Sequence, residues 1–506
     1  MIPVSLQELA DAAGGYLDQV PDPQRQVVGP VLVDSRLVQP GSLFVALPGE
    51  RVDGRDFVPA ALAAGAVAAL VSRPIGGPAI VVDDVLVALG RVARSVLDRL
   101  TPALQVVSLT GSSGKTTTKD LLAGLLAAAG PTVAPAGSLN NELGVPLTVL
   151  RSTAQTRFLL LELGARGIGH IDYLCRIAPP AIGLVLNVGA AHASEFGGRE
   201  QTAQAKGELV EALPADGVAV LNLDDPLVAA MAARTPARVL GFGRGATAQV
   251  RAEDVRLDHR ACPSFRLVTA TGQAPVRLQL HGEHQVQNAL AAASVALTVG
   301  LTVDRVAELL SLAPPSSRWR MEVTERPDGV LVVNDAYNAN PDSVRAALEA
   351  LAVIGTGRRT WAVLGEMLEL GAESGPEHEA VGRLAARLGV DQVLAVGEGA
   401  RPVLVGAGEG GAAISWAAGV DQAAGQLADR LRPGDVVLVK ASRSIGLDRL
   451  AASLTAGDVR KPAGTGQNLG RESGSATDPA RAPGGTDSGL VGDGTESGSS
   501  DREEVG

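Results

Sequence analysis

The chain has few of the residues that would mark a secreted or membrane protein. Its 506 residues include only two cysteines, Cys175 and Cys262, which cannot form a disulfide framework and which fit a reducing compartment. The longest run of small apolar residues, 58–72, is too short to span a bilayer. The N-terminal residues lack a basic stretch followed by an apolar core, so we expect no secretory signal. These absences predict a cytoplasmic chain without membrane insertion.

Positive charge is also scarce. The sequence has 44 Lys and Arg against 55 Asp and Glu, which gives a formal net charge of −11. An acidic protein has no overall field to attract nucleic acid or anionic lipid. We therefore expect no nucleic-acid partner, and any phosphate group must be bound in a local site.

Length and hydrophobic patterning predict three α/β domains and a tail. At about 150 residues per domain, a chain of this length holds three domains. We place the first at 1–102, the second at 103–313 and a third, Rossmann-like domain at 314–458. Alternating strand and helix patterns in the last two predict mostly parallel sheets with helices on both faces. Residues 459–506 are rich in Gly, Ser, Asp and Glu, and we expect this tail to be disordered.

The individual elements are predicted from apolar periodicity and from flanking turn residues. The predicted strands are 31–33, 43–47, 106–109, 158–161, 182–188, 218–221, 330–334, 361–364, 392–396 and 435–440. The predicted helices are 58–70, 85–99, 116–129, 200–212 and 304–311. No G-x-G-x-x-G follows a strand of the third domain, so we predict no dinucleotide site there.

The sharpest motif is a phosphate-binding loop. Residues 110–117 read T-G-S-S-G-K-T-T and lie between a predicted strand and a predicted helix. Backbone N–H groups at a helix N-terminus bind phosphate oxygens, Lys115 can reach the terminal phosphates, and a threonine hydroxyl can bind Mg²⁺. The longer G-x-x-x-x-G-K-[ST] pattern is not met, because position 109 is Leu. The expected ATP-binding residues of the loop are Gly111, Ser112, Ser113, Gly114, Lys115, Thr116 and Thr117.

Two polar residues, Glu162 and His192, follow the strands predicted at 158–161 and 182–188. Ligands gather at the carboxyl ends of parallel strands, so both side chains can face the phosphate loop. A carboxylate suits Mg²⁺, whereas histidine is a poorer ligand for this hard cation. On the residues alone, His192 can equally be structural, and Lys206 reads as a solvated lysine on a helix surface.

Several motifs, taken in order, resemble the Mur ligase family. They are D-S-R at 34–36, P-G-S-L-F-V-A-L at 40–47, the short phosphate loop, L-N-N-E-L-G-V-P at 139–146 and N-D-A-Y-N-A-N-P at 334–341. The resemblance runs from about residue 30 to 450. It is to the branch that joins D-alanyl-D-alanine to a UDP-linked muramoyl tripeptide, and it implies a UDP-sugar-binding first domain and an ATP-binding second domain.

The resemblance also implies roles for single residues. Lys115, Lys206 and His192 would be catalytic, and Mg²⁺ would be held by Thr116, Glu162, His192 and a carbamate on Lys206. Asn288 would contact adenine, Arg318 the γ-phosphate and Asp335 the ribose. The substrate-binding residues would be Ser35, Arg36, Asn140, Asn141, Asn338 and Asn340. The chain departs from the family pattern in having Gln285 where Asn is usual, Ser317 before Arg318 where Gly is usual, and Ala441 in K-A-S-R.

The implied reaction uses ATP and Mg²⁺. ATP phosphorylates the terminal carboxylate of UDP-N-acetylmuramoyl-tripeptide, and the amine of D-alanyl-D-alanine attacks the acyl phosphate to give a pentapeptide. We expect a monomer. The alternatives are a sibling ligase or a folylpolyglutamate synthetase adding one amino acid, a P-loop NTPase without ligase activity, and a non-catalytic scaffold. The motif at 334–341 argues against the first two, and the sequence does not specify the third residue of the tripeptide.

Overall fold

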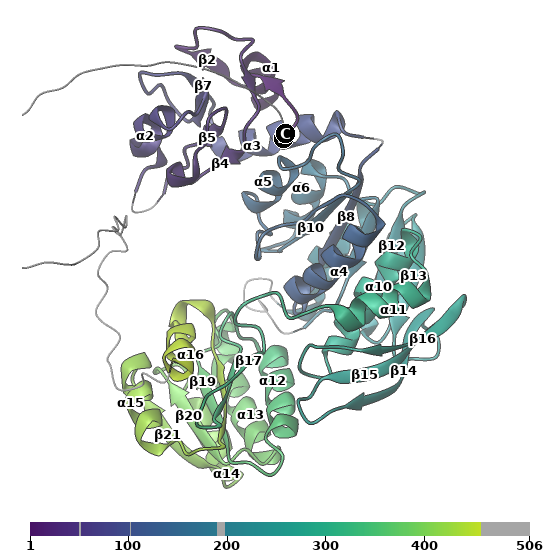
Figure 1. The fold of residues 1–506 in the computed structure, drawn as a ribbon, viewed down its shortest axis with the longest axis vertical. Coiled ribbons are helices and arrows are strands. Elements are labelled where there is room, and N and C mark those ends of the chain that lie inside the picture. The colour runs from purple at the N-terminus through teal and green to yellow at the C-terminus, as the bar shows by residue number, and fades with distance from the viewer. Residues whose placement is uncertain (50–51, 102, 190–197, 457–506) are drawn as a thin grey trace, which may run out of the picture. The chain divides into compact units, whose positions relative to one another are not determined.

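A computed structural model describes residues 1–49, 52–101, 103–189 and 198–456 (Figure 1). The predicted tail and His192 lie outside the described residues. The α/β class is confirmed, since helices alternate with strands gathered into sheets of two, nine, six and five strands. No helix in the described part of the chain is long and apolar enough to cross a membrane.

The N-terminal region is built on a five-stranded sheet of order β2-β7-β6-β5-β4, in which only β2 runs antiparallel to its neighbour. Its strands are β2 Tyr16–Asp18, β4 Val31–Leu32, β5 Leu43–Val45, β6 Ala68–Val71 and β7 Ala79–Val81. A separate pair joins β1 Val4–Ser5 and β3 Gln26–Val27. The helices are α1 Leu6–Ala13, α2 Val58–Ala63 and α3 Val85–Asp98.

The helix predicted at 58–70 is wrong in its second half. Helix α2 ends at Ala63, and β6 begins at Ala68. Gly65 between them has φ +105°, and a Cβ there would lie 2.8 Å from Cα of Pro40. A left-handed glycine in close contact with the turn before β5 follows the end of the helix. An unbroken run of Ala and Val carries no periodicity that would reveal this break.

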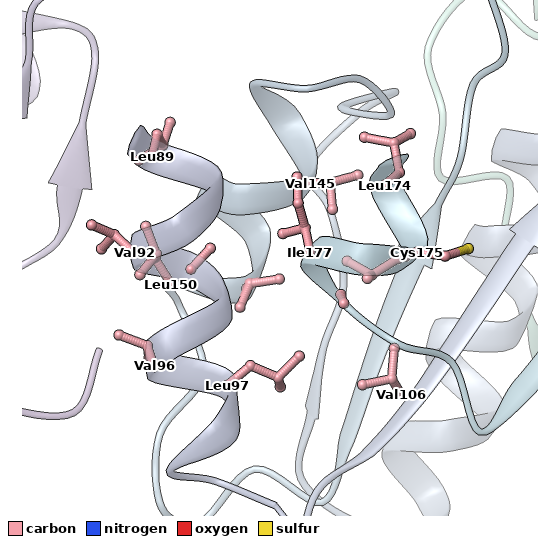
Figure 2. Close-up of a cluster of buried hydrophobic side chains, with 14 of the residues drawn as sticks. Leu89, Val92, Val96, Leu97, Val106, Val145, Leu150, Leu174, Cys175 and Ile177 are labelled. Atoms are coloured by element: carbon pink, nitrogen blue, oxygen red, sulfur yellow. The ribbon is translucent and has the colours of Figure 1, made fainter. Parts of the chain in front are cut away.

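Helix α3 shares an apolar cluster with the elements that follow it. Its buried side chains include Leu89, Val92 and Leu97. Figure 2 draws them in one cluster with side chains from α5 (Gly144–Val149) and α6 (His170–Ile177), such as Val145 and Ile177. The cluster therefore continues past residue 102, where we place the first domain boundary. That boundary and those at 313 and 458 stay predictions.

The middle region holds a nine-stranded sheet of order β16-β15-β14-β13-β12-β11-β8-β10-β9. Neighbours from β9 to β14 are parallel, and β15 and β16 are antiparallel additions. The strands are β8 Gln105–Thr110, β9 Thr132–Val133, β10 Phe158–Glu162, β11 Ile182–Val185, β12 Val218–Asn222, β13 Arg238–Gly243, β14 Val250–Leu257, β15 Pro263–Thr269 and β16 Gly272–Arg277. The other helices are α4 Lys115–Ala129, α8 Arg199–Glu211, α9 Pro226–Ala229, α10 Gln285–Thr298 and α11 Val303–Leu312.

Most predicted elements of this region are confirmed. Strand β11 is shorter than predicted and ends at Val185. The strands between 238 and 277 were not predicted. Strand β13 is parallel to its neighbours and only its second half is buried, whereas β15 and β16 are antiparallel additions in which buried and less buried residues alternate.

The C-terminal region is a six-stranded sheet of order β17-β18-β22-β19-β20-β21, with only β17 antiparallel. Its strands are β17 Glu322–Glu325, β18 Leu331–Asn334, β19 Thr360–Gly365, β20 Gln392–Val396, β21 Ala413–Ala417 and β22 Val436–Lys440. Its helices are α12 Pro341–Ile354, α13 Ser374–Arg387, α14 Pro402–Glu409, α15 Val420–Arg430 and α16 Leu447–Thr455. The four strands predicted here are confirmed.

Candidate active site

The candidate site lies where four neighbouring parallel strands end. Strands β10, β8, β11 and β12 are adjacent in the sheet, so the residues after their carboxyl ends meet at one edge. A cavity of about 660 Å³ opens there. Among its lining residues are those of the phosphate loop from Ser112 to Thr117, together with Glu162, Asn187, Lys206 and Asn222.

The phosphate loop presents free backbone donors. Helix α4 begins at Lys115, and the first helical hydrogen bond is donated by Thr118 N–H to Gly114 O, at 2.9 Å. The N–H groups of residues 114–117 have no acceptor among the residues that the structure describes. Gly114 has φ +78°, and a Cβ there would lie 2.3 Å from Asn288 Oδ1. The loop thus needs glycine at 114 and offers four N–H groups with the positive end of the helix dipole.

Lys115 is half-buried and close to these donors. Its Nζ donates to Gly111 O at 2.7 Å. Burial lowers the pKa of the ammonium, the carboxylate of Glu162 raises it, and the cation of Arg320 lowers it again. Two cations that share a cavity with unpaired N–H groups make a site for an anion.

Glu162 supplies a carboxylate oriented by its neighbours. It is fully buried at the end of β10. Its Oε1 accepts from Ser138 Oγ and Asn140 Nδ2, both at 2.9 Å, and lies 3.4 Å from Thr116 Oγ1. Its Oε2 is buried and has no hydrogen-bond partner among the residues that the structure describes. A buried carboxylate oxygen is costly without a partner, so this atom fits a cation.

These groups suit Mg²⁺, which takes oxygen ligands and keeps several waters. Glu162 and Thr116 would hold it. The structure describes no cluster of three His, Cys, Asp or Glu residues that could hold a metal within 1–49, 52–101, 103–189 and 198–456. A site with one carboxylate, a hydroxyl, waters and phosphate oxygens needs no such cluster.

Two asparagines predicted to bind substrate line the cavity but already have protein partners. Asn140 donates to Glu162 and, at 3.2 Å, to Ser138 Oγ. Asn141 Oδ1 accepts the N–H of Gly144 at 2.9 Å, at the start of α5. Lys119 fixes the loop that precedes these asparagines, since its Nζ donates to Pro135 O and Gly137 O at 3.2 and 3.0 Å. The substrate roles of Asn140 and Asn141 stay predictions. The structure shows instead that Asn140 orients Glu162 by a hydrogen bond.

Lys206 is not a surface residue. It lies on α8, is 3% exposed and lines the cavity. Burial, with a smaller contribution from Lys115, lowers the pKa of its amine to about 7. A large fraction of this amine is therefore neutral near pH 7, and the solvated-lysine interpretation does not apply.

The arginine near the phosphate loop is Arg320. Its Nη2 donates to Thr116 Oγ1 at 2.8 Å, and its guanidinium lies 4.0 Å from the ring centroid of Tyr337. Arg318, to which we assigned the γ-phosphate, is exposed and does not line the cavity. The role of Arg318 stays a prediction, and Arg320 is the residue that the structure places beside the loop.

The other predicted nucleotide residues also reach the cavity. Asn288 packs behind the loop, where its Oδ1 accepts from Thr118 Oγ1 at 3.3 Å and its Nδ2 donates to Gln285 Oε1 at 2.8 Å. Asp335 pairs with Lys440 at 2.5 Å. Burial lowers the pKa of the neighbouring His284 to about 4, so this ring is neutral at pH 7.

The remaining predicted substrate residues fall in two places. Asn338 and Asn340 line the cavity, and Asn340 also caps α12 by accepting the N–H of Ser343 at 2.8 Å. Ser35 and Arg36 lie in a 3-10 turn of the N-terminal region and do not line it. Arg36 is 82% exposed and pairs with Asp34, which lowers the pKa of that carboxyl to about 2.

Three residues of the site were missed from the sequence: Ser138, Asn187 and Arg320. Asn187 lies two residues beyond β11, and Glu162 is the last residue of β10, so the place of Asn187 near the carboxyl end of the strand predicted at 182–188 was a usable signal. Ser138 and Arg320 come from loops, where spacing does not indicate which side chain turns inward.

Comparisons with known proteins agree with this geometry. Residues 29–105 match the Mur ligase family catalytic domain, 109–296 the Mur ligase middle domain, and 319–443 the Mur ligase glutamate ligase domain. A UDP-N-acetylmuramoyl-tripeptide--D-alanyl-D-alanine ligase of Mycobacterium tuberculosis is 48% identical, over 91% of this chain and 99% of that protein.

Solved structures give the same result. MurF from Acinetobacter baumannii has a TM-score of 0.80 and 34% identity, covering 90% of this chain and 99% of that one. MurF from Thermotoga maritima in complex with ADP has a TM-score of 0.73 and 31% identity, covering 86% and 98%. The predicted resemblance and architecture are confirmed, and the chain belongs to the Mur ligase family.

Proposed function

We propose that this chain joins D-alanyl-D-alanine to UDP-N-acetylmuramoyl-tripeptide in an ATP-dependent reaction that forms a peptide bond. The observation that carries the proposal is one cavity lined by the phosphate loop, with its unpaired N–H groups and Lys115, and by Glu162, whose buried Oε2 has no hydrogen-bond partner among the described residues. It occurs in a chain 48% identical to a ligase of this activity over 91% of its length. ATP and Mg²⁺ are the cofactors.

The chain's own residues act by binding and by neutralising charge. The N–H groups of 114–117 bind phosphate oxygens, and Lys115 and Arg320 face the negative charge that develops as the phosphoryl group moves to the substrate carboxylate. Mg²⁺ bound at Glu162 and Thr116 would neutralise further phosphate charge. The neutral amine of the dipeptide then displaces phosphate from the acyl phosphate and forms the C–N bond.

Several finer assignments belong to the same proposal. We assign the UDP-sugar to residues 1–102 with Ser35 and Arg36, and the peptide to Asn140, Asn141, Asn338 and Asn340. Asn288 and Asp335 take the adenosine, and a carbamate on Lys206 acts with His192 at the metal. We place the chain in the cytoplasm, since ATP is its energy source and its two cysteines are free. We also expect it to be a monomer.

The acceptor can be tested by mass spectrometry of the nucleotide product. Purified chain with ATP, Mg²⁺ and the tripeptide nucleotide receives either D-alanyl-D-alanine or single amino acids. We expect a product heavier by one dipeptide minus water, and none with single amino acids. Addition of one amino acid alone would identify a sibling ligase activity instead.

A further inference from the structure

The first half of the phosphate loop is held by a side chain to which the reaction gives no role. Asn187 Oδ1 accepts the N–H of Ser112 and that of Ser113, both at 2.9 Å, and its Nδ2 donates to Ser113 O at 3.2 Å. We propose that Asn187 is a positioning residue that fixes this half of the loop with an uncharged group, so that the second half can bind the nucleotide phosphates. The inference rests on the proposed ATP-dependent function.

Neighbouring contacts extend this attachment. The N–H of Ser112 also donates to Asn187 O at 3.1 Å, and the N–H of Gly189 donates to Ser112 Oγ at 2.9 Å. A Cβ at Gly111 would lie 2.8 Å from Cβ of Leu186. The phosphate loop is thus attached to residues 186–189. Among the described residues, Asn187 is the only one whose side-chain amide forms hydrogen bonds with the loop.

The donors of the loop divide into two groups. Those of Ser112 and Ser113 are used by Asn187, whereas those of 114–117 have no acceptor within the described ranges. Without the Asn187 side chain, the N–H of Ser113 would lose its partner and that of Ser112 would keep only the backbone oxygen of residue 187, so the backbone could turn these donors toward other acceptors. The four free donors would then no longer be held in one arrangement, and nucleotide binding would pay for ordering them.

The charge of residue 187 distinguishes this role from a purely structural one. An aspartate has nearly the same shape and keeps both acceptor contacts with Ser112 and Ser113. It loses the donor to Ser113 O and adds a negative charge beside the bound phosphates, where burial strengthens repulsion. A structural role therefore tolerates Asn187→Asp better than Asn187→Ala, whereas a phosphate-positioning role tolerates Asn187→Ala better.

The test measures Kd for ADP in the presence of Mg²⁺ by titration calorimetry, and Tm of the nucleotide-free protein, on the full chain. The matched control is Thr360→Val, at the start of β19, where the hydroxyl donates to Asp391 Oδ2 at 3.0 Å and accepts the Asp391 N–H at 3.1 Å. This control removes a partly buried hydrogen-bonding group away from the loop.

We expect Asn187→Ala to raise Kd roughly tenfold and Asn187→Asp to raise it roughly a hundredfold or more. Thr360→Val should lower Tm without changing Kd. Asn187→Ser, which keeps a shorter acceptor, serves if Asn187→Ala does not fold, and it should bind more weakly than the parent and more tightly than Asn187→Asp.

Binding within twofold of the parent in both Asn187 variants would overturn the inference, as would tighter binding by Asn187→Asp than by Asn187→Ala. Those results would leave the proposed function standing. Lack of ADP binding by the parent chain would instead overturn the proposed function, and the inference with it.

Discussion

Ser138 and Glu162 share a 2.9 Å hydrogen bond that fixes one carboxylate oxygen and leaves the other free. Oε1 receives this bond and a second from Asn140, while Oε2 is buried without a partner in the described part of the chain. The carboxylate is therefore oriented before any metal binds, with one oxygen bonded to the protein and the other left for a cation that Glu162 would hold.

Replacing Ser138 by alanine should weaken metal binding. A hydrogen bond to a charged group contributes about 1.5–3 kcal/mol, so we expect the affinity for Mn²⁺, used as a paramagnetic stand-in, to fall roughly tenfold or more. Electron paramagnetic resonance titration of the chain with ADP measures it. Ser138→Thr keeps the hydroxyl and should retain most of the affinity. Equal binding by Ser138→Ala and the parent would show that the hydrogen bond does not orient Glu162.

Replacing Arg318 and replacing Arg320 should have very different effects on kcat. Arg320 contacts Thr116 and lies near Lys115, whereas Arg318 is exposed. We expect Arg320→Ala to lower kcat by roughly a hundredfold or more, through lost stabilisation of phosphoryl transfer, and Arg318→Ala to stay within a few-fold of the parent. Steady-state kinetics at saturating ATP decides between them. The reverse order would restore the γ-phosphate role predicted for Arg318.

Lys206 should make stability depend on pH with a defined sign. Its pKa falls from 10.5 to about 7 on folding because it is buried, so the folded chain binds fewer protons between these values. The penalty of burying the cation is complete below pH 7 and is relieved as pH rises toward 10.5. We therefore expect the stability advantage of Lys206→Met over the parent to be largest near pH 6 and to shrink by pH 9. Denaturant unfolding in CO₂-free buffer measures it, and a constant difference would contradict the shifted pKa.

The same neutral amine can react with CO₂. A carbamate would turn a buried cation beside Lys115 into an anion with two oxygen donors for a hard metal. We expect Lys206→Ala and Lys206→Arg to lose most activity while retaining the fold, and an added short carboxylate to restore part of it in the alanine variant. ¹³C NMR after incubation with ¹³CO₂ should show a carbamate carbon in the parent that is absent from both variants. Full turnover by Lys206→Arg would rule out this role.

The sequence predicted the fold best where a local pattern determines it. The phosphate loop could be placed because a strand, a glycine-containing loop and a helix follow one another, as β8 and α4 show. The strands between 238 and 277 and the break at Gly65 were missed, since position in the sheet and contact with Pro40 are tertiary properties.

The site residues, like the fold, could be predicted only where a local pattern determines them. Lys115 and Glu162 could be found from their positions after strands. The contacts made by Ser138 and Asn187 depend on residues 24 and 74–75 positions away, which no local spacing reports. The choice between Arg318 and Arg320 depends on how one loop turns, and only coordinates can give that.

Release of phosphate from ATP tests the central claim most directly. With Mg²⁺ and UDP-N-acetylmuramoyl-tripeptide present, the chain should release phosphate at a sustained rate only after D-alanyl-D-alanine is added. The amount released should equal the pentapeptide nucleotide formed, one for one. Equal release without the dipeptide, or release without pentapeptide, would contradict the account and identify a nucleotide hydrolase.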